Sequence, residues 1–249
     1  MQKIVTIGVV VAIGALAASG CNRRESSVIG QGQAEEILHE LQEIRRLLEG
    51  QGGARPAPQA APAPQPQSAE VSIAGAHSLG SVDAPVTVVE FTDYQCPFCS
   101  RFATTTFAEL KAKYIDTGQV RLVSRDLPLP MHANAERAAY AARCADEQGQ
   151  YWEMREVMFG NINALGDASL VDYASGLGLD RAGFEACLGS GKYRDVVQAD
   201  MAAASALGLT GTPSFIVGRA SGDTVEGNII VGAQPFAAFD GQIQALLNE

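Results

Sequence analysis

The sequence predicts an α/β domain over residues 71–249, preceded by a short helix and a proline-rich linker. Three patterns predict the domain. Residues 86–92 (VTVVEFT) form a run rich in β-branched side chains, which is typical of a buried strand. Residues 133–200 have a helical pattern that breaks at glycine-containing stretches. Residues 214–217 (SFIV) and 228–231 (NIIV) then indicate a closing pair of strands.

The other elements fit around these three patterns. Proline is favoured at the first position of a helix, so we expect a helix that begins at Pro97 and runs to about Ile115. Residues 119–124 (QVRLVS) predict a second strand, and residues 236–247 predict an amphipathic final helix. A helical block at about residues 130–205 therefore separates the first two strands from the closing pair.

Composition excludes several classes of protein. The chain has 249 residues, of which 47% are apolar and 18% charged, so it can build a core and is not disordered throughout. Its formal net charge of -10 argues against nucleic acid as the partner, because phosphate backbones attract basic surfaces. Five cysteines are too few for a miniprotein held together by disulfides, so their positions matter more than their number.

Residues 1–21 predict a signal peptide for export. One lysine precedes an apolar stretch over residues 4–18, which is shorter than the ~20 residues that a membrane-spanning helix needs. Small residues lead directly into Cys21, which resembles the lipobox of bacterial lipoproteins, and this resemblance implies lipidation of Cys21. An ordinary cleaved signal with a chance cysteine is the alternative. A lipidated Cys21 would leave an even set of four cysteines.

The next two segments predict a tether and a spacer. Residues 22–53 hold a short helix whose apolar residues recur at spacings of 3 and 4, as in a coiled coil: Ala34, Ile37, Leu41, Ile44 and Leu48. Self-association through this seam would give a homo-oligomer. The alternative is an amphipathic helix that lies on its own domain or on lipid. Residues 54–70, rich in Ala, Pro and Gln, predict an extended linker.

The chemistry is concentrated in Cys96-Pro97-Phe98-Cys99, where a strand meets a helix. Two thiols separated by three positions on a first helical turn can close a small disulfide. The helix N-terminus stabilises an anion, so we expect Cys96 to be an accessible thiol with a lowered pKa. Cys99 lies one turn inside and is suited to be the resolving thiol. Stabilising the reduced form makes the disulfide a stronger oxidant.

The same spacing also occurs in zinc sites and in inert structural disulfides. A zinc site of this type needs a second close pair of Cys or His ligands, which the sequence does not offer, because His39, His77 and His132 are scattered. We therefore expect no metal at Cys96 and Cys99.

The segment 80–102 (GSVDAPVTVVEFTDYQCPFCSRF) resembles the active-site strand and helix of DsbA-like thiol:disulfide oxidoreductases of the thioredoxin superfamily. The resemblance continues through residues 126–129, His132, 139–152 and 211–215, and so covers nearly all of 71–249. It implies a thioredoxin fold in which the helical block is the family's inserted helical domain. It does not extend to the segments before residue 71.

The resemblance implies a role for each matching residue. Cys96 resembles the nucleophilic cysteine and Cys99 its partner. Glu90 matches a buried acid that helps to move protons, and burial in an apolar strand would raise its pKa. The alternative for Glu90 is a purely structural pairing with a buried base.

A second part of the site comes from the end of the chain. Thr212-Pro213 resembles the family's cis-proline turn, which lies against the active disulfide and, together with Phe98, would bind an extended substrate segment. Phe98 replaces the histidine of the strongest oxidants and cannot carry a positive charge, so we expect a less depressed pKa at Cys96 and a milder oxidant. Thr before the proline also occurs in the disulfide isomerases of the superfamily.

Cys144 and Cys187 both lie in the helical block, flanked by small or apolar residues. We expect them to form a structural disulfide. A second redox pair is the alternative, although neither thiol has a resolving partner nearby in the sequence.

These observations predict an extracytoplasmic thiol:disulfide oxidoreductase, anchored in the membrane through Cys21, that introduces disulfides into exported proteins. It would use its redox-active disulfide and no other cofactor. The resemblance implies a quinone-linked membrane protein as redox partner. The alternatives are a disulfide isomerase or reductase that is oligomerised by the N-terminal helix, and a chaperone-like lipoprotein that binds clients without catalysis. Copper delivery fits less well, because no Met or His ligand set lies near the two thiols.

Overall fold

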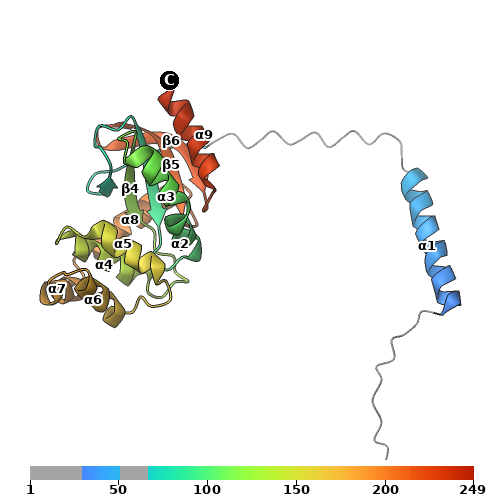
Figure 1. Cartoon of the computed structure of the whole chain (residues 1–249), viewed down its shortest axis with the longest axis horizontal. Coiled ribbons are helices and arrows are strands. Elements are labelled where there is room, and N and C mark those ends of the chain that lie inside the picture. The colour runs from blue at the N-terminus through green and yellow to red at the C-terminus, as the bar shows by residue number, and fades with distance from the viewer. Residues whose placement is uncertain (1–29, 51–66) are drawn as a thin grey trace, which may run out of the picture. The chain divides into compact units, whose positions relative to one another are not determined.

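The computed structural model of the chain describes residues 30–50 and 67–249. These form two units that are taken separately: helix α1 (Gln31–Gly50), and the domain that follows it (Figure 1). The predicted signal peptide with Cys21 and most of the predicted linker lie outside the described residues. Within the described parts of the chain, no helix is long and apolar enough to span a membrane.

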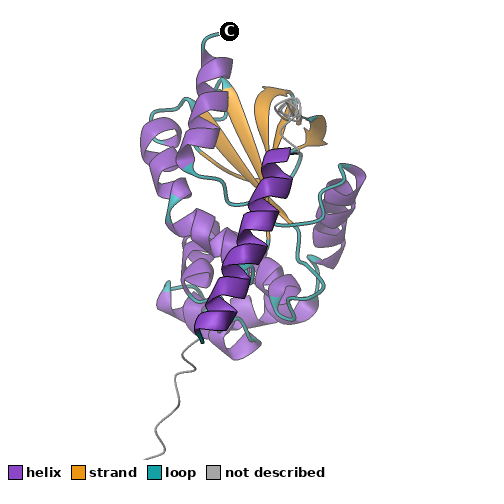
Figure 2. Cartoon of the chain, turned by 90° about the vertical axis from the view of Figure 1, so that its right-hand side faces the viewer, coloured by secondary structure: helices purple, strands orange, loops and turns teal. Residues whose placement is uncertain are grey.

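The domain has a mixed sheet that lies between helices, and further helices lie at one end of the sheet (Figure 2). Over residues 67–249 it has six strands in the order β1-β6-β5-β3-β4-β2. Strands β3 and β4 run parallel, whereas the other neighbours pair antiparallel. The strands are β1 (Ser68–Ser72), β2 (His77–Leu79), β3 (Val86–Thr92), β4 (Val120–Asp126), β5 (Ser214–Ser221) and β6 (Thr224–Val231). The expected α/β class is therefore confirmed.

The helices form two groups. One group crosses the faces of the sheet: α2 (Pro97–Thr104), α3 (Thr106–Leu110) with a π-helical turn η1 (Lys111–Ile115), α8 (Arg194–Ala206) and α9 (Phe236–Leu247). The other group lies at one end of the sheet in Figure 1 and forms most of the helical block: α4 (Ala135–Asp146), α5 (Tyr151–Gly160), α6 (Asp167–Gly176) and α7 (Arg181–Ser190).

The core is divided accordingly. On one face of the sheet, Phe102 of α2 and Phe239 of α9 pack on Phe215 of β5. On the other face, Phe91 and Val123 belong to a cluster that includes Ala204 of α8. The helical block has a third cluster of its own, and this cluster includes Cys96 and Cys99. Cys96 and Cys99 therefore lie where the block meets the sheet.

Two boundaries differ from the sequence-based expectation. The sheet begins at Ser68, inside the segment that the sequence predicts as linker, because residues 68–72 pair with β6. The single helix expected over residues 97–115 is broken at Thr105, which has φ -124° and ψ -82°. The hydroxyls of Thr104 and Thr105 donate to the carbonyls of Ser100 and Arg101, four residues back, and such local bonds compete with regular helix.

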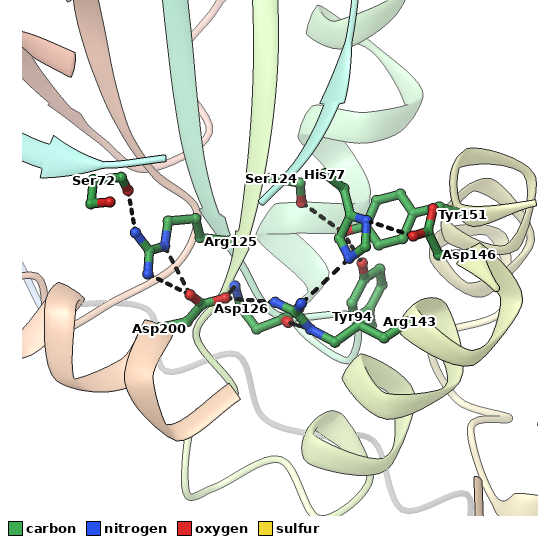
Figure 3. Close-up of polar contacts among 10 residues, drawn as sticks. All are labelled: Ser72, His77, Tyr94, Ser124, Arg125, Asp126, Arg143, Asp146, Tyr151 and Asp200. Carbon is green, nitrogen blue, oxygen red and sulfur yellow. Dashed lines mark hydrogen bonds and ion pairs between the residues drawn. The ribbon is translucent and has the colours of Figure 1, made fainter. Parts of the chain in front are cut away.

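Buried charges join the helical block to the sheet (Figure 3). Arg143 of α4 contacts Asp126 of β4 at 2.7 Å and Asp200 of α8 at 2.8 Å. Asp200 in turn pairs with Arg125 of β4 at 2.6 Å. All four residues are buried, so each charge depends on its partners for the stabilisation that water would otherwise give.

Candidate active site

Cys96 lies at the junction that the sequence predicts. The turn after β3 is closed by a hydrogen bond from the Cys96 N–H to the carbonyl of Asp93 at 3.1 Å. Cys96 is the N-cap of α2, and Pro97 takes the first helical position. The helix therefore directs its unpaired N–H groups and the positive end of its dipole toward the Cys96 sulfur.

These donors make Cys96 an acidic thiol. Hydrogen bonding from the Cys99 thiol, followed by the Thr212 hydroxyl and the N–H groups of Cys99 and Phe98, lowers the pKa of Cys96 to about 5, against the opposing effect of burial. A free cysteine has a pKa of about 8.5, so Cys96 is a thiolate at neutral pH. The sequence predicts an accessible thiol at Cys96, but only 3% of the residue's surface is exposed.

Cys99 has the opposite character. It lies on the inner side of α2 and is fully buried. Burial, and the hydrogen bond that its thiol donates to Cys96, raise its pKa well above that of a free thiol. Cys96 is therefore ionised, as a nucleophile should be, and Cys99 stays protonated and donates a hydrogen bond to it.

The expected cis-proline turn lies beside Cys96. The Thr212–Pro213 peptide bond is cis, and the Thr212 carbonyl oxygen lies 3.4 Å from the Cys96 sulfur, which donates to it only in the protonated form. The Thr212 hydroxyl is buried and has no partner within the described structure apart from the Cys96 sulfur. Phe98 points outward and is 54% exposed, with the Arg101 guanidinium 5.2 Å from its ring centroid.

Glu90 lies at the centre of the sheet and has a partner that the sequence does not reveal. It is fully buried in β3, where its neighbours are Ser124 of β4 and Phe215 of β5. Its Oε2 accepts from Arg155 of α5 at 2.7 Å, whereas its Oε1 has no hydrogen-bond partner among residues 30–50 and 67–249. Arg155 is therefore the buried base that a structural role of Glu90 requires. The other carboxylate oxygen of Glu90 stays unpaired among the described residues.

Asp93 also belongs to the site, although the sequence gives it no role. Its fully buried carboxylate accepts from the Gln95 N–H at 2.7 Å, the Leu129 N–H at 2.8 Å and His132 Nδ1 at 2.7 Å. It thus joins the turn before Cys96 to the loop after β4. Its position three residues before Cys96, together with His132 in the family resemblance, is the signal that could have identified this pair.

Cys144 and Cys187 are joined by a disulfide between α4 and α7, with their Cα atoms 5.8 Å apart. Together with Glu147 they form a group of metal-ligand atoms, found among the described residues. Both sulfurs belong to the disulfide and are not thiolates, so this group lacks the ligands that a thiolate metal site needs.

The thioredoxin family profile matches residues 72–240. The chain belongs to the thioredoxin family. The match covers strands β2 to β6, the Cys96–Cys99 turn, the helical block and the cis-proline turn.

Solved structures with the same fold include several DsbA proteins. Alpha-DsbA1 of Wolbachia pipientis is 25% identical, with a TM-score of 0.62 over 70% of this chain and 92% of that chain. A thioredoxin-like oxidoreductase of Silicibacter pomeroyi is 28% identical, with a TM-score of 0.59 over 70% and 93%. BdbD of Bacillus subtilis, at 24% identity and a TM-score of 0.64 over 74% and 99%, shares the fold. The expected thioredoxin fold is confirmed, and the domain is a DsbA-like oxidoreductase domain.

Curated relatives extend well beyond this domain. A Na(+)/H(+) antiporter NhaA 3 of Salinispora tropica is 39% identical over 142 residues, which are 57% of this chain and 21% of the relative. An antiporter NhaA of Herminiimonas arsenicoxydans is 37% identical over 141 residues, 57% of this chain and 22% of the relative. The chain thus spans about a fifth of these relatives' length.

Proposed function

We propose that this protein introduces disulfides into exported proteins through the Cys96–Cys99 pair. The observation that supports this direction is the Cys96 thiolate, whose pKa of about 5 lies well below that of a free thiol. A disulfide whose reduced form is stabilised gives up its bond readily to substrate thiols, and so acts as an oxidant.

The exchange proceeds in two steps. In the oxidised enzyme, a substrate thiolate attacks the Cys96 sulfur, a mixed disulfide forms, and Cys99 leaves and takes up a proton. A second substrate thiolate then attacks the substrate sulfur of the mixed disulfide. The product leaves with its own disulfide, and Cys96 leaves as a thiolate. Two electrons pass from two substrate thiols to Cys96 and Cys99.

The substrate would bind beside the Cys96 sulfur, along the Thr212–Pro213 turn. The Thr212 carbonyl lies 3.4 Å from the Cys96 sulfur, and Pro213 removes a competing N–H from the same turn. An extended substrate segment could pair with this backbone, while the exposed Phe98 ring offers an apolar contact. Thr212, Pro213 and Phe98 are thus the substrate-binding residues of the proposal.

The pair must be reoxidised after each turnover. We assign this step to a quinone-linked membrane protein, and we place the enzyme outside the cytoplasm, held at the membrane by a lipid on Cys21. Its substrates would be thiols of exported proteins. The chain would need neither a metal nor an organic cofactor for the exchange itself.

The decisive experiment measures direction. The reduction potential of the Cys96/Cys99 couple is determined against glutathione, and the thiols of the full chain are trapped in cells and counted by mass. We expect a potential between those of thioredoxin and DsbA, about −270 and −120 mV, and a pair that is mostly oxidised in the cell. A pair that is mostly reduced would instead support the isomerase or reductase, whose members share Thr before the proline. A pair that does not exchange would support the client-binding alternative.

Glu90 needs a separate test because its two roles predict different results. As a proton acceptor for Cys99, its replacement in Glu90→Gln should slow exchange about tenfold or more at pH 7. As a structural partner of Arg155, its loss should instead lower the free energy of unfolding, because an unpaired buried charge remains. The Arg155→Lys variant, which keeps the positive charge, is the control for the ion pair.

A further inference from the structure

Helix α1 presents an apolar face that the oxidoreductase chemistry does not use. Ile37, Leu41 and Ile44 are 47%, 56% and 52% exposed, although side chains of this type gain stability mainly when they are buried. The helix has 20 residues, and helices in proteins owe most of their stability to the packing of an apolar face rather than to helix propensity. A partner that covers this face would stabilise the helix.

The charged residues of α1 help to decide between three partners for its apolar face: lipid, the chain's own domain and a second copy of α1. Helices that lie on lipid carry Lys and Arg beside the apolar face, whereas Glu35, Glu36, Glu40 and Glu43 outnumber Arg45 and Arg46 here. The chain's own domain is also a poor partner, because residues 67–249 hold 22 acidic and 12 basic residues. A second copy of α1 carries the same excess of acids, but its apolar residues recur with the same heptad spacing, which is the pattern by which one helix packs on another. The heptad spacing therefore favours a second copy of α1 as the occupant.

The heptad positions indicate how many copies associate. When Ala34 is placed at position a, Leu41 and Leu48 also occupy a, and Ile37 and Ile44 occupy d. Leu at a with Ile at d favours bundles of three or four strands over dimers. The flanking positions agree, since Leu38 at e and Leu47 at g are 58% and 60% exposed and would be covered only in a bundle with a wider core.

The charged flanking positions indicate the orientation. In a parallel bundle, position g of one helix lies beside position e of the next heptad of its neighbour. Glu40 occupies g and Arg45 occupies e, so each copy would place Glu40 against Arg45 of the neighbouring copy. An antiparallel arrangement would instead bring g beside g, and so Glu40 beside another Glu40.

We propose that this protein is a homo-oligomer of three or four copies, assembled through a parallel bundle of α1 helices. The assembly would contain three or four Cys96/Cys99 pairs, one from each copy joined through the α1 bundle. The proposal concerns α1 alone and does not depend on the direction of electron flow at the active site.

Sedimentation equilibrium of the full chain, solubilised in a mild detergent, tests the proposal. We expect a protein mass three or four times that of one copy, and a monomer or a dimer would overturn it. Leu41→Asp should reduce the assembly to monomers because it adds a charge to the seam. The matched control is His39→Asp, which adds the same charge on the opposite face and should leave the mass unchanged. Retained circular dichroism of the domain shows that each variant is folded.

Two further measurements exclude the competing arrangements. Glu40→Arg and Arg45→Glu should each weaken association about tenfold, and the double exchange should restore it, because it regenerates opposite charges across the interface. Failure of the double exchange to restore association overturns the parallel arrangement.

Flotation with neutral vesicles tests the alternative that α1 lies on lipid. If α1 does not bind lipid, the Leu41→Asp variant should float as well as the wild type. If Leu41→Asp reduces flotation and leaves the mass unchanged, lipid covers the face and the proposal is wrong.

Discussion

The two cysteine pairs of the domain show how position decides what a cysteine does. Cys96 and Cys99 lie three residues apart at a helix N-terminus, and one of them is strongly acidic. Cys144 and Cys187 lie 43 residues apart between two helices of the block, and their disulfide holds those helices together. The first pair has donors around one sulfur that stabilise its reduced form. The second pair closes a long loop, so its effect is on the unfolded chain. The predictions below test this division of roles.

The largest expected effect comes from Cys96→Ser, which removes the nucleophile. Oxidation of a reduced peptide that contains two cysteines should fall at least about 1,000-fold, because a serine hydroxyl cannot form a mixed disulfide. The double variant Cys144→Ala/Cys187→Ala is the control and should retain exchange within about twofold at 25 °C. Equal losses in both variants would contradict the division of roles.

The same double variant should be much less stable. Closing a loop of 43 residues stabilises a fold by about 4 kcal/mol in the chain-entropy model, so the free energy of unfolding should fall by up to about that amount. Denaturant unfolding of the oxidised protein measures the difference. The Cys96→Ser variant should show little change in the same assay, which makes it the reciprocal control.

The reduced form should respond to pH through Cys96. Its pKa is about 5 in the fold and about 8.5 in the unfolded chain, so the thiolate contributes stability that is complete above about pH 8.5 and is lost as the pH falls through 5. The melting temperature of the reduced protein, measured relative to the oxidised protein, should therefore rise between pH 5 and 8.5. Alkylation of Cys96 should show a midpoint near pH 5. A midpoint near 8.5 would remove the basis of the proposed oxidase.

The smallest expected effect is at Thr212. Thr212→Val removes the hydroxyl and keeps the shape, so the pKa of Cys96 should rise by about one pH unit, as expected for the loss of one hydrogen bond to a charged group. Thr212→Ser retains the hydroxyl and should keep the original value. Rates of alkylation as a function of pH measure both variants, and equal shifts in the two would show that the methyl group rather than the hydroxyl matters.

The local parts of the site could be predicted from the sequence, whereas its long-range partners could not. Pro97 marks the helix start, and the β-branched run before it marks a buried strand, because both signals depend on neighbouring residues. The short strands β1 and β2 lack such a run, and they exist only because β6 and β4 pair with them. Contacts across the fold leave no local trace: Arg155 lies 65 residues from Glu90, and His132 lies 39 residues from Asp93.

The buried ion pairs make the helical block inseparable from the sheet. Arg143 and Arg155 extend from the block to acids on β4 and β3, so a variant without the block would leave Asp126 and Glu90 without these arginine partners. The minimal sheet with its two cysteines is therefore not a viable fragment of this protein. Anyone who grafts the Cys96–Cys99 turn onto a smaller scaffold must first replace these acids with neutral residues.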